Sequence, residues 1–236
     1  MSDLCAGVIG GMGPDATVDF MARVLALTPA SGDQDHIRLL VDQNPKIPNR
    51  QRAILGGGES PAPTLAAMAA RLEASGCDFL VMPCNTAHVF LDAILAATRI
   101  PFVSIIDVTL ERALGSGADR IGVLASGACI EAGVYQDAIA AAGKTPVLQT
   151  QSELADLTLL IARIKTGDRG PGVRAEMQAL AKRLTERRAE ALILGCTEIP
   201  IVLDETDADV PLFSSSDILA ETTVAIAVGN APLPRR

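Results

Sequence analysis

The sequence lacks several features that mark whole classes of protein. None of its runs of lysine and arginine is longer than Arg187-Arg188, and the formal net charge is −8 with a pI near 4.8. Phosphate backbones are bound by clustered positive charge, so we expect no nucleic acid partner. No apolar stretch reaches the roughly 18 residues of a membrane span. The segment Met1-Ser2-Asp3-Leu4-Cys5 lacks the positively charged region with which a signal peptide begins. We therefore expect a cytoplasmic protein with no membrane partner.

Cysteine and histidine are too sparse for a disulfide framework or a metal centre. The chain has five cysteines, an odd number, and two histidines, with no Cys-x-x-Cys pair and no histidine-rich spacing. Such a sequence predicts reduced thiols, no structural disulfide and no metal site. With 49% hydrophobic and 20% charged residues, a chain of this length should bury roughly 70–75% of its unfolded surface.

Short apolar runs alternate with alanine-rich segments that have helical spacing. The runs are too short and too continuous for surface helices, so they predict buried parallel strands. The alternation predicts an α/β fold built from βαβ units. The expected strands are residues 6–10, 37–41, 79–82, 102–105, 121–124, 191–194 and 210–213. The expected helices are residues 14–27, 63–74, 86–97, 132–142, 154–164, 173–188 and 218–228.

Two pairs of similar segments divide the chain into halves. Met82-Pro83-Cys84-Asn85-Thr86-Ala87-His88 and Leu194-Gly195-Cys196-Thr197-Glu198-Ile199-Pro200 place their cysteines 112 residues apart (196 minus 84). Gly7-Val8-Ile9-Gly10-Gly11 returns as Gly122-Val123-Leu124-Ala125-Ser126 after 115 residues (122 minus 7). We expect one domain of residues 1–105 plus 213–236, a second of residues 106–212, and a hinge near residues 104–107.

Each cysteine motif follows an apolar run and precedes polar residues. In parallel sheets, ligands lie beyond the carboxyl ends of the strands, which is where both motifs are expected. The start of a helix lowers the pKa of a nearby thiol, and two facing thiols would form an acid/base pair. Asn85, Thr86 and Thr197 are suited to donate hydrogen bonds to a substrate carboxylate and to stabilise an enolate-like intermediate.

On these motifs the chain resembles the aspartate/glutamate racemase superfamily, and most closely its aspartate racemase branch. Glutamate racemases usually carry histidine after the second Cys-Thr, where this chain has Glu198. Ser126 and Cys129 stand where the family more often has threonine. The segments that carry the resemblance are Gly10-Gly11-Met12-Gly13-Pro14-Asp15-Ala16-Thr17, Asn44-Pro45-Lys46-Ile47-Pro48-Asn49-Arg50, Ile164-Lys165-Thr166-Gly167 and the two cysteine motifs.

The resemblance implies a cofactor-independent racemase with two pseudosymmetric α/β domains, each a mostly parallel sheet flanked by helices, and an active site in the cleft between them. It implies a homodimer that interconverts L- and D-aspartate without a metal. Cys84 and Cys196 would be catalytic, one removing the α-proton and the other protonating the opposite face. The matching substrate-binding positions are Met12, Asn85, Thr86 and Thr197 around the α-carboxylate, Arg50 and Lys165 at the distal carboxylate, and Glu198 at the substrate amine, beside a neighbouring residue or at a helix cap.

Several alternatives stay open on the sequence. The substrate could be glutamate or a range of amino acids, and a maleate isomerase or arylmalonate decarboxylase would use related cysteine positions. Two cysteines together with Arg50 disfavour a decarboxylase. A non-catalytic module that binds a small acid, or a dithiol redox module with a Cys84–Cys196 disulfide, is the non-enzymatic alternative. His88 either tunes Cys84 or is a packing or surface residue, and the glycines at 10–13 do not form a phosphate loop.

Overall fold

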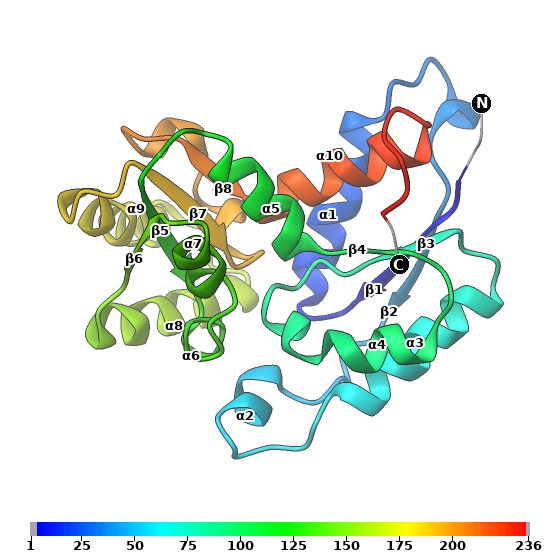
Figure 1. Cartoon of the computed structure of the whole chain (residues 1–236), viewed down its shortest axis with the longest axis horizontal. Helices are drawn as coiled ribbons and strands as arrows, with labels where there is room; N and C mark the ends of the chain where they lie inside the picture. The colour runs from blue at the N-terminus through cyan, green and yellow to red at the C-terminus, as the bar shows by residue number, and fades with distance from the viewer. Residues whose placement is uncertain (1–3, 235–236) are drawn as a thin grey trace. The chain divides into compact units, whose positions relative to one another are not determined.

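The computed structural model describes residues 4–234, so the expectation about a leader at Met1-Ser2-Asp3 lies outside the described residues. The first half of the chain forms a parallel sheet with the strand order β2-β1-β3-β4 (Figure 1). The central strand β1 (Ala6–Gly10) is fully buried and pairs with β2 (Leu39–Gln43) and β3 (Phe79–Val81). The edge strand β4 (Phe102–Val103) pairs with β3.

The second half repeats this arrangement. Its parallel sheet has the order β6-β5-β7-β8, in which β5 takes the central place of β1 and β7 takes the place of β3. The predicted α/β fold with two similar halves is confirmed by these two sheets. The strands are β5 (Arg120–Ala125), β6 (Thr145–Leu148), β7 (Ala191–Gly195) and β8 (Leu212–Ser214).

Helices cover both faces of the first sheet. Figure 1 shows α3 (Ala62–Ala74) and α4 (Leu91–Ala97) on one side, and they pack on each other. On the other side, α1 (Pro14–Leu27) and α10 (Ser215–Ala227) are joined by an ion pair between Arg23 and Asp217. The remaining helical segments of this half are η1 (Asp33–Asp35), α2 (Arg50–Ile54) and the 3-10 helix η2 (Thr86–Phe90).

The second sheet is covered by a longer pair of helices. α8 (Gln151–Lys165) packs on α9 (Pro171–Glu186), and α9 contacts β5 and β7. Thr150 caps α8 in a capping box with Glu153, which satisfies two otherwise unpaired N–H groups. The other helical segments are α5 (Ile105–Leu114), α6 (Gly127–Glu131), α7 (Gln136–Ala141), η3 (Ile199–Ile201) and η4 (Glu205–Asp207).

The chain separates into two compact units. One contains residues up to Ile105 together with those from Ser216 onward, and the other runs from Ile106 to Ser215. Each unit has its own hydrophobic core beneath its sheet. The chain thus leaves the first unit after β4 and returns to it at the start of α10.

Some expected elements were wrong in extent or kind. The expected strand at residues 102–105 ends at Val103, because Ile105 and Ile106 bury their side chains as the first turn of α5. The expected helix at residues 86–97 is a 3-10 helix followed by α4. The strand β6 was missed because Pro146 is a poor strand residue, and β6 lies at a sheet edge, where proline is tolerated.

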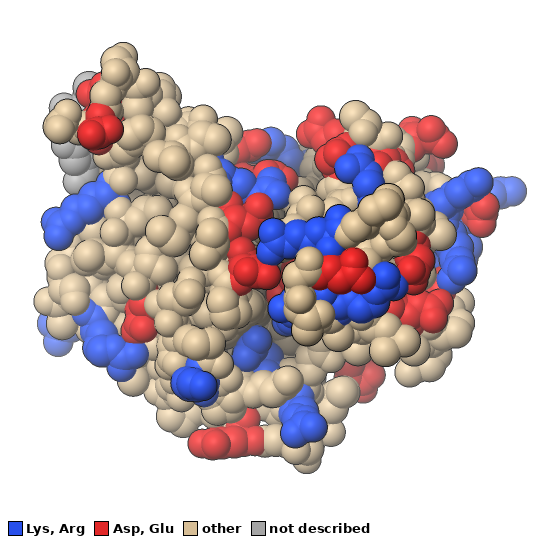
Figure 2. Space-filling model, turned by 180° about the vertical axis from the view of Figure 1, so that it is seen from behind, with Lys and Arg blue, Asp and Glu red and all other residues tan. Residues whose placement is uncertain are grey.

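Charged side chains of both signs are mixed on the surface. On the face shown in Figure 2, lysine and arginine lie among aspartate and glutamate, without a continuous basic tract among the described residues drawn. Arginines of α8 and α9 form ion pairs with acidic side chains, as in Arg163–Glu176 at 2.8 Å and Arg174–Asp207 at 2.8 Å. Among residues 4–234, no helix is long and apolar enough to cross a membrane.

Candidate active site

Cys84 lies just beyond the carboxyl end of β3, in the first unit. Its side chain is buried in one cluster with Met12, which follows β1, and Ile47, which follows β2. The loops after three neighbouring strands therefore meet at the edge of the sheet where a ligand is expected. Asn85 is buried and Thr86 half-buried directly after the cysteine.

His88 holds the backbone of Cys84. Its Nδ1 lies 2.8 Å from the carbonyl oxygen of Cys84, and its Nε2 accepts a hydrogen bond from the Ile105 N–H at 3.3 Å. Since Nε2 is the acceptor, Nδ1 carries the proton of the neutral ring. Burial lowers the pKa of His88 to about 4. His88 is therefore a neutral, buried residue that ties the Cys84 loop to the start of α5.

The loop after β1 requires glycine at position 11 for a structural reason. Gly11 has φ of +95°, and a Cβ there would lie 2.4 Å from the Asn44 carbonyl carbon. The buried Thr17 hydroxyl accepts from the Gly11 N–H at 2.9 Å and donates to the Gly13 carbonyl at 3.0 Å. This bonding fixes the loop and places Met12 beside Cys84 in the buried cluster.

Arg50 is the first residue of α2, a short helix capped by Asn49. Its guanidinium donates to the carbonyls of Ile47 at 3.4 Å and Pro48 at 3.2 Å. Its Nε is buried without a hydrogen bond among the described residues. Because α2 contacts the η2 segment that follows Cys84, Arg50 lies in the same region as Cys84 with donor capacity left for a carboxylate.

Cys196 lies directly after β7, in the second unit, with two of the predicted residues around it. Its thiol donates to Glu198 Oε2 at 3.0 Å. Glu198 Oε1 lies 3.2 Å from Lys165 Nζ, at the end of α8. The Glu198 side chain is 3% exposed and that of Lys165 is 40% exposed. Among the described residues, the Glu198 side chain makes no helix-capping bond and interacts with Cys196 and with the cation of Lys165.

The expected lowering of the thiol pKa is wrong for Cys196. Burial, followed by the Glu198 carboxylate, raises the pKa of the Cys196 thiol well above its usual range, while Lys165 opposes the rise. The first helix after Cys196 is η3, which has three residues and so contributes little dipole, and the Glu198 N–H at its start opposes the rise in pKa without cancelling it. Thr197, the residue between Cys196 and Glu198 in the sequence, is also buried.

Two buried residues of the second unit were missed by sequence reasoning. Gln149 follows β6, accepts from the Ala125 N–H at 3.1 Å, and has a buried Nε2 without a hydrogen bond among the described residues. Gln149 could have been found as a polar residue at the end of a strand, but the strand β6 was itself not predicted. Tyr135 is fully buried, and its ring would lie 2.9 Å from a Cβ added to Gly195, the residue before Cys196.

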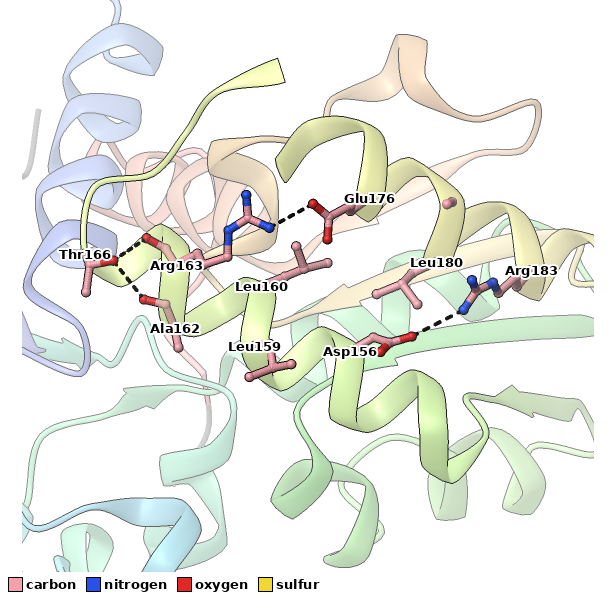
Figure 3. A pocket seen from close by; sticks show the side chains of 10 residues that line it. Asp156, Leu159, Leu160, Ala162, Arg163, Thr166, Glu176, Leu180 and Arg183 are labelled. Atoms are coloured by element: carbon pink, nitrogen blue, oxygen red, sulfur yellow. Dashed lines mark hydrogen bonds and ion pairs between the residues drawn. The ribbon is translucent and has the colours of Figure 1, made fainter. Parts of the chain in front are cut away.

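A separate cavity of about 650 Å³ lies between α8 and α9 (Figure 3). The ion pairs Arg163–Glu176 and Asp156–Arg183 span it above an apolar floor that includes Leu160 and Leu180. None of the predicted site residues lines this cavity. Among the described residues, no group of three or more His, Cys, Asp and Glu side chains is placed to hold a metal ion.

Comparison with known proteins gives consistent matches. The sequence model of the Asp/Glu/hydantoin racemase family matches residues 9–223. The broad specificity amino-acid racemase RacX of Bacillus subtilis is 29% identical over 223 residues, covering 93% of this chain and 96% of RacX. The aspartate racemase of Picrophilus torridus superposes with a TM-score of 0.86 at 29% identity, covering 96% of this chain and 94% of that one.

The fold extends to more distant relatives. A glutamate racemase from Francisella tularensis superposes with a TM-score of 0.68 at 19% identity, covering all of this chain and 85% of that one. Because the family match spans most of the chain and includes both cysteine motifs, the chain belongs to the Asp/Glu/hydantoin racemase family and is an amino-acid racemase.

Proposed function

We propose that this enzyme racemises an acidic amino acid, with aspartate as its main substrate, by a cofactor-independent mechanism that uses Cys84 and Cys196. The observation that carries the proposal is topological. Cys84 follows β3 and Cys196 follows β7, and these strands hold the same place in the two equivalent sheets. The chain thus presents one thiol at the ligand-binding edge of each sheet.

In the proposed reaction, the thiolate of one cysteine removes the α-proton, so that a C–H bond breaks and an S–H bond forms. The other thiol gives its proton to the opposite face of the carbanion, and its electron pair stays on sulfur. The carbanion shares its charge with the α-carboxylate. Asn85, Thr86 and Thr197 support the proposal because their donor groups directly follow the two cysteines.

We assign the distal carboxylate of the substrate to Arg50 and Lys165. A guanidinium offers a planar pair of donors and an ammonium a compact positive charge. The Picrophilus torridus aspartate racemase supports aspartate as the substrate. The second candidate is a broader substrate range, which the match to RacX favours.

Racemisation of L-aspartate, L-glutamate and L-alanine, followed by circular dichroism, tests the substrate. We expect the highest catalytic efficiency with aspartate and no increase on adding pyridoxal phosphate. In deuterated water, early deuterium should appear in the product enantiomer, because each face has its own acid/base group. Heavy early exchange into the starting enantiomer would contradict the two-thiol mechanism, and equal efficiencies for the three amino acids would favour the broader range.

We further propose a cytoplasmic homodimer that binds neither nucleic acid nor membrane. All five cysteines are free thiols, which supports a reducing location; the dimer rests on the family resemblance. Light scattering should give twice the mass of the 24.5 kDa chain. A thiol titration in denaturant should count five free cysteines per chain, and fewer would contradict the reduced state.

A further inference from the structure

Glu198 is a buried carboxylate in contact with a proposed catalytic thiol. Its Oε2 accepts the thiol hydrogen of Cys196 at 3.0 Å, and its Oε1 faces the Lys165 ammonium at 3.2 Å. That Oε1 is buried and makes no hydrogen bond among the described residues. A buried charge needs compensation, so the carboxylate depends on the thiol hydrogen and on Lys165.

The contact favours the protonated form of Cys196. If the thiol lost its proton, a thiolate and a carboxylate would face each other about 3 Å apart, and two like charges at that distance disfavour ionisation. Lys165 offsets one negative charge but not two. Tyr135 is a further titratable group that acts on Cys196, and burial raises the pKa of Tyr135 well above the usual range, so it stays neutral. Cys129 faces Tyr135 from α6.

Cys84 has different surroundings. Its carbonyl is held by the neutral His88. Within residues 4–234, no carboxylate is hydrogen-bonded to the Cys84 thiol. The two cysteines occupy equivalent places in the two sheets, yet only Cys196 has an acidic partner on its sulfur.

We infer that Glu198 is a positioning residue that holds a proton on Cys196 in the resting enzyme, so that Cys196 is the acid and Cys84 the base in the first turnover. The inference rests on the proposed two-thiol reaction. Cys84 as thiolate takes the α-proton, and Cys196 gives its proton to the opposite face and keeps the electron pair. The resting form returns when Cys196 gains a proton from water and Cys84 releases one. Cys196 serves as the base for the opposite enantiomer only from its thiolate form.

The rate of alkylation by iodoacetamide, measured against pH on the whole enzyme without substrate, tests this inference. The thiolate is the reactive form, and the mass of each cysteine peptide reports Cys84 and Cys196 separately. We expect Glu198→Gln to lower the pH midpoint of Cys196 alkylation by at least about one pH unit. At a fixed pH below the midpoint, this corresponds to a roughly tenfold higher rate of alkylation. The midpoint of Cys84 should not move. Glu205→Gln, which removes an exposed negative charge from the same unit, should leave both midpoints unchanged.

An unchanged or raised Cys196 midpoint in Glu198→Gln would overturn the inference. If that variant does not fold, Glu198→Asp tests the same contact, because the shorter side chain withdraws the carboxylate from the Cys196 sulfur and should lower the pH midpoint of Cys196 alkylation; no change would overturn the inference. These measurements need no turnover, so a failure of the enzyme to racemise any acidic amino acid would count against the proposed function alone.

The pH profile of kcat/KM tests the acid assignment. Its descending limb reports loss of the proton from the acid, and its ascending limb reports ionisation of the base. In Glu198→Gln we expect the descending limb to move to lower pH by the same amount as the Cys196 alkylation midpoint. Movement of the ascending limb instead would assign Cys196 as the base in the resting enzyme and overturn this part of the inference.

Discussion

The Nδ1 atom of His88 lies 2.8 Å from the carbonyl oxygen of Cys84, in a hydrogen bond that spans four residues. The opposite ring nitrogen accepts from the Ile105 N–H at 3.3 Å. One buried imidazole thus links the end of the β3 loop to the first residue of α5. The bond pattern requires the neutral ring, since a protonated Nε2 would face an N–H donor.

We predict that His88 makes the stability of the protein depend on pH. Its pKa is about 4 when folded and 6.5 when unfolded, so between these values the unfolded state binds more protons. The free energy of unfolding therefore falls as the pH drops through this window, by about 2 kcal/mol between about pH 7.5 and pH 5. Urea unfolding at the two pH values measures the loss.

The variant His88→Gln is the control for this effect. It should be less stable than the wild type near pH 7.5 and should show a smaller loss on going to pH 5, because the titrating group is gone. Arg187 lowers the pKa of Glu153 to about 2 against the opposing effect of burial, so Glu153 titrates at lower pH and contributes mainly below pH 4.5. An equal loss in the wild type and His88→Gln would show that other groups cause the pH dependence.

Most strands and the positions of the two cysteine motifs could be predicted from the sequence, because their signals lie within short segments. Ala6–Gly10 was predicted with its observed bounds, and so was the helix Pro14–Leu27, where a proline begins an amphipathic segment. The repeat of Gly7 and Cys84 at Gly122 and Cys196 anticipated two equivalent sheets. Hydrophobic continuity and internal repetition are readable from residue order alone.

The contacts that set the chemistry could not be read in the same way. Lys165 and Glu198 are 33 residues apart (198 minus 165) and form an ion pair because α8 ends near the loop that follows β7. The bond from Ile105 to His88 depends on where α5 starts, and the apolar pair Ile105-Ile106 reads equally well as a strand. Tertiary packing decides these contacts, and no single sequence segment contains both partners.

Gly195 provides a steric test of the Cys196 loop. A Cβ at this position would lie 2.9 Å from the Tyr135 ring and 3.0 Å from the Ala125 Cβ. We expect Gly195→Ala to destabilise the protein by about 1–3 kcal/mol through overpacking and to lower activity, because the next residue is Cys196. Thermal unfolding and racemase rates measure the two effects.

Gly172→Ala is the matched control for that substitution. Gly172 lies near the start of α9 with open space where its Cβ would be, so alanine should be neutral or stabilise by about 0.5–1 kcal/mol. Wild-type stability in Gly195→Ala would mean that Tyr135 moves aside at little cost. In that case the tyrosine would not constrain the loop.

The thiols themselves should act as a unit. Cys84→Ser and Cys196→Ser should each reduce racemisation by orders of magnitude, and the double variant should lose little more, because one proton transfer is useless without the other. Cys5→Ala and Cys77→Ala are the controls. Both positions are buried, and burial together with Cys5 raises the pKa of Cys77 to about 12, which removes it from proton transfer near neutral pH. Near-wild-type rates in Cys84→Ser would exclude that thiol from the mechanism.

Arg50 should determine whether the enzyme distinguishes a dicarboxylate from alanine. Its guanidinium binds two carbonyls of its own loop, and its Nε is buried without a hydrogen bond among the described residues. A charged hydrogen bond contributes about 1.5–3 kcal/mol, so Arg50→Ala should lower kcat/KM for aspartate by roughly 10- to 100-fold. The loss for alanine should be much smaller, because alanine has no distal carboxylate.

Arg52→Ala is the matched control for the Arg50 prediction, since Arg52 is exposed, carries the same charge and lies on the same short helix. It should leave the efficiencies for aspartate, glutamate and alanine near those of the wild type. Glutamate differs from aspartate by one methylene, which is worth only about 1–3 kcal/mol in a pocket, so Arg50→Ala should impair both acids. An equal loss on all three amino acids would show that Arg50 supports the loop from Ile47 to Asn49 and does not bind the substrate.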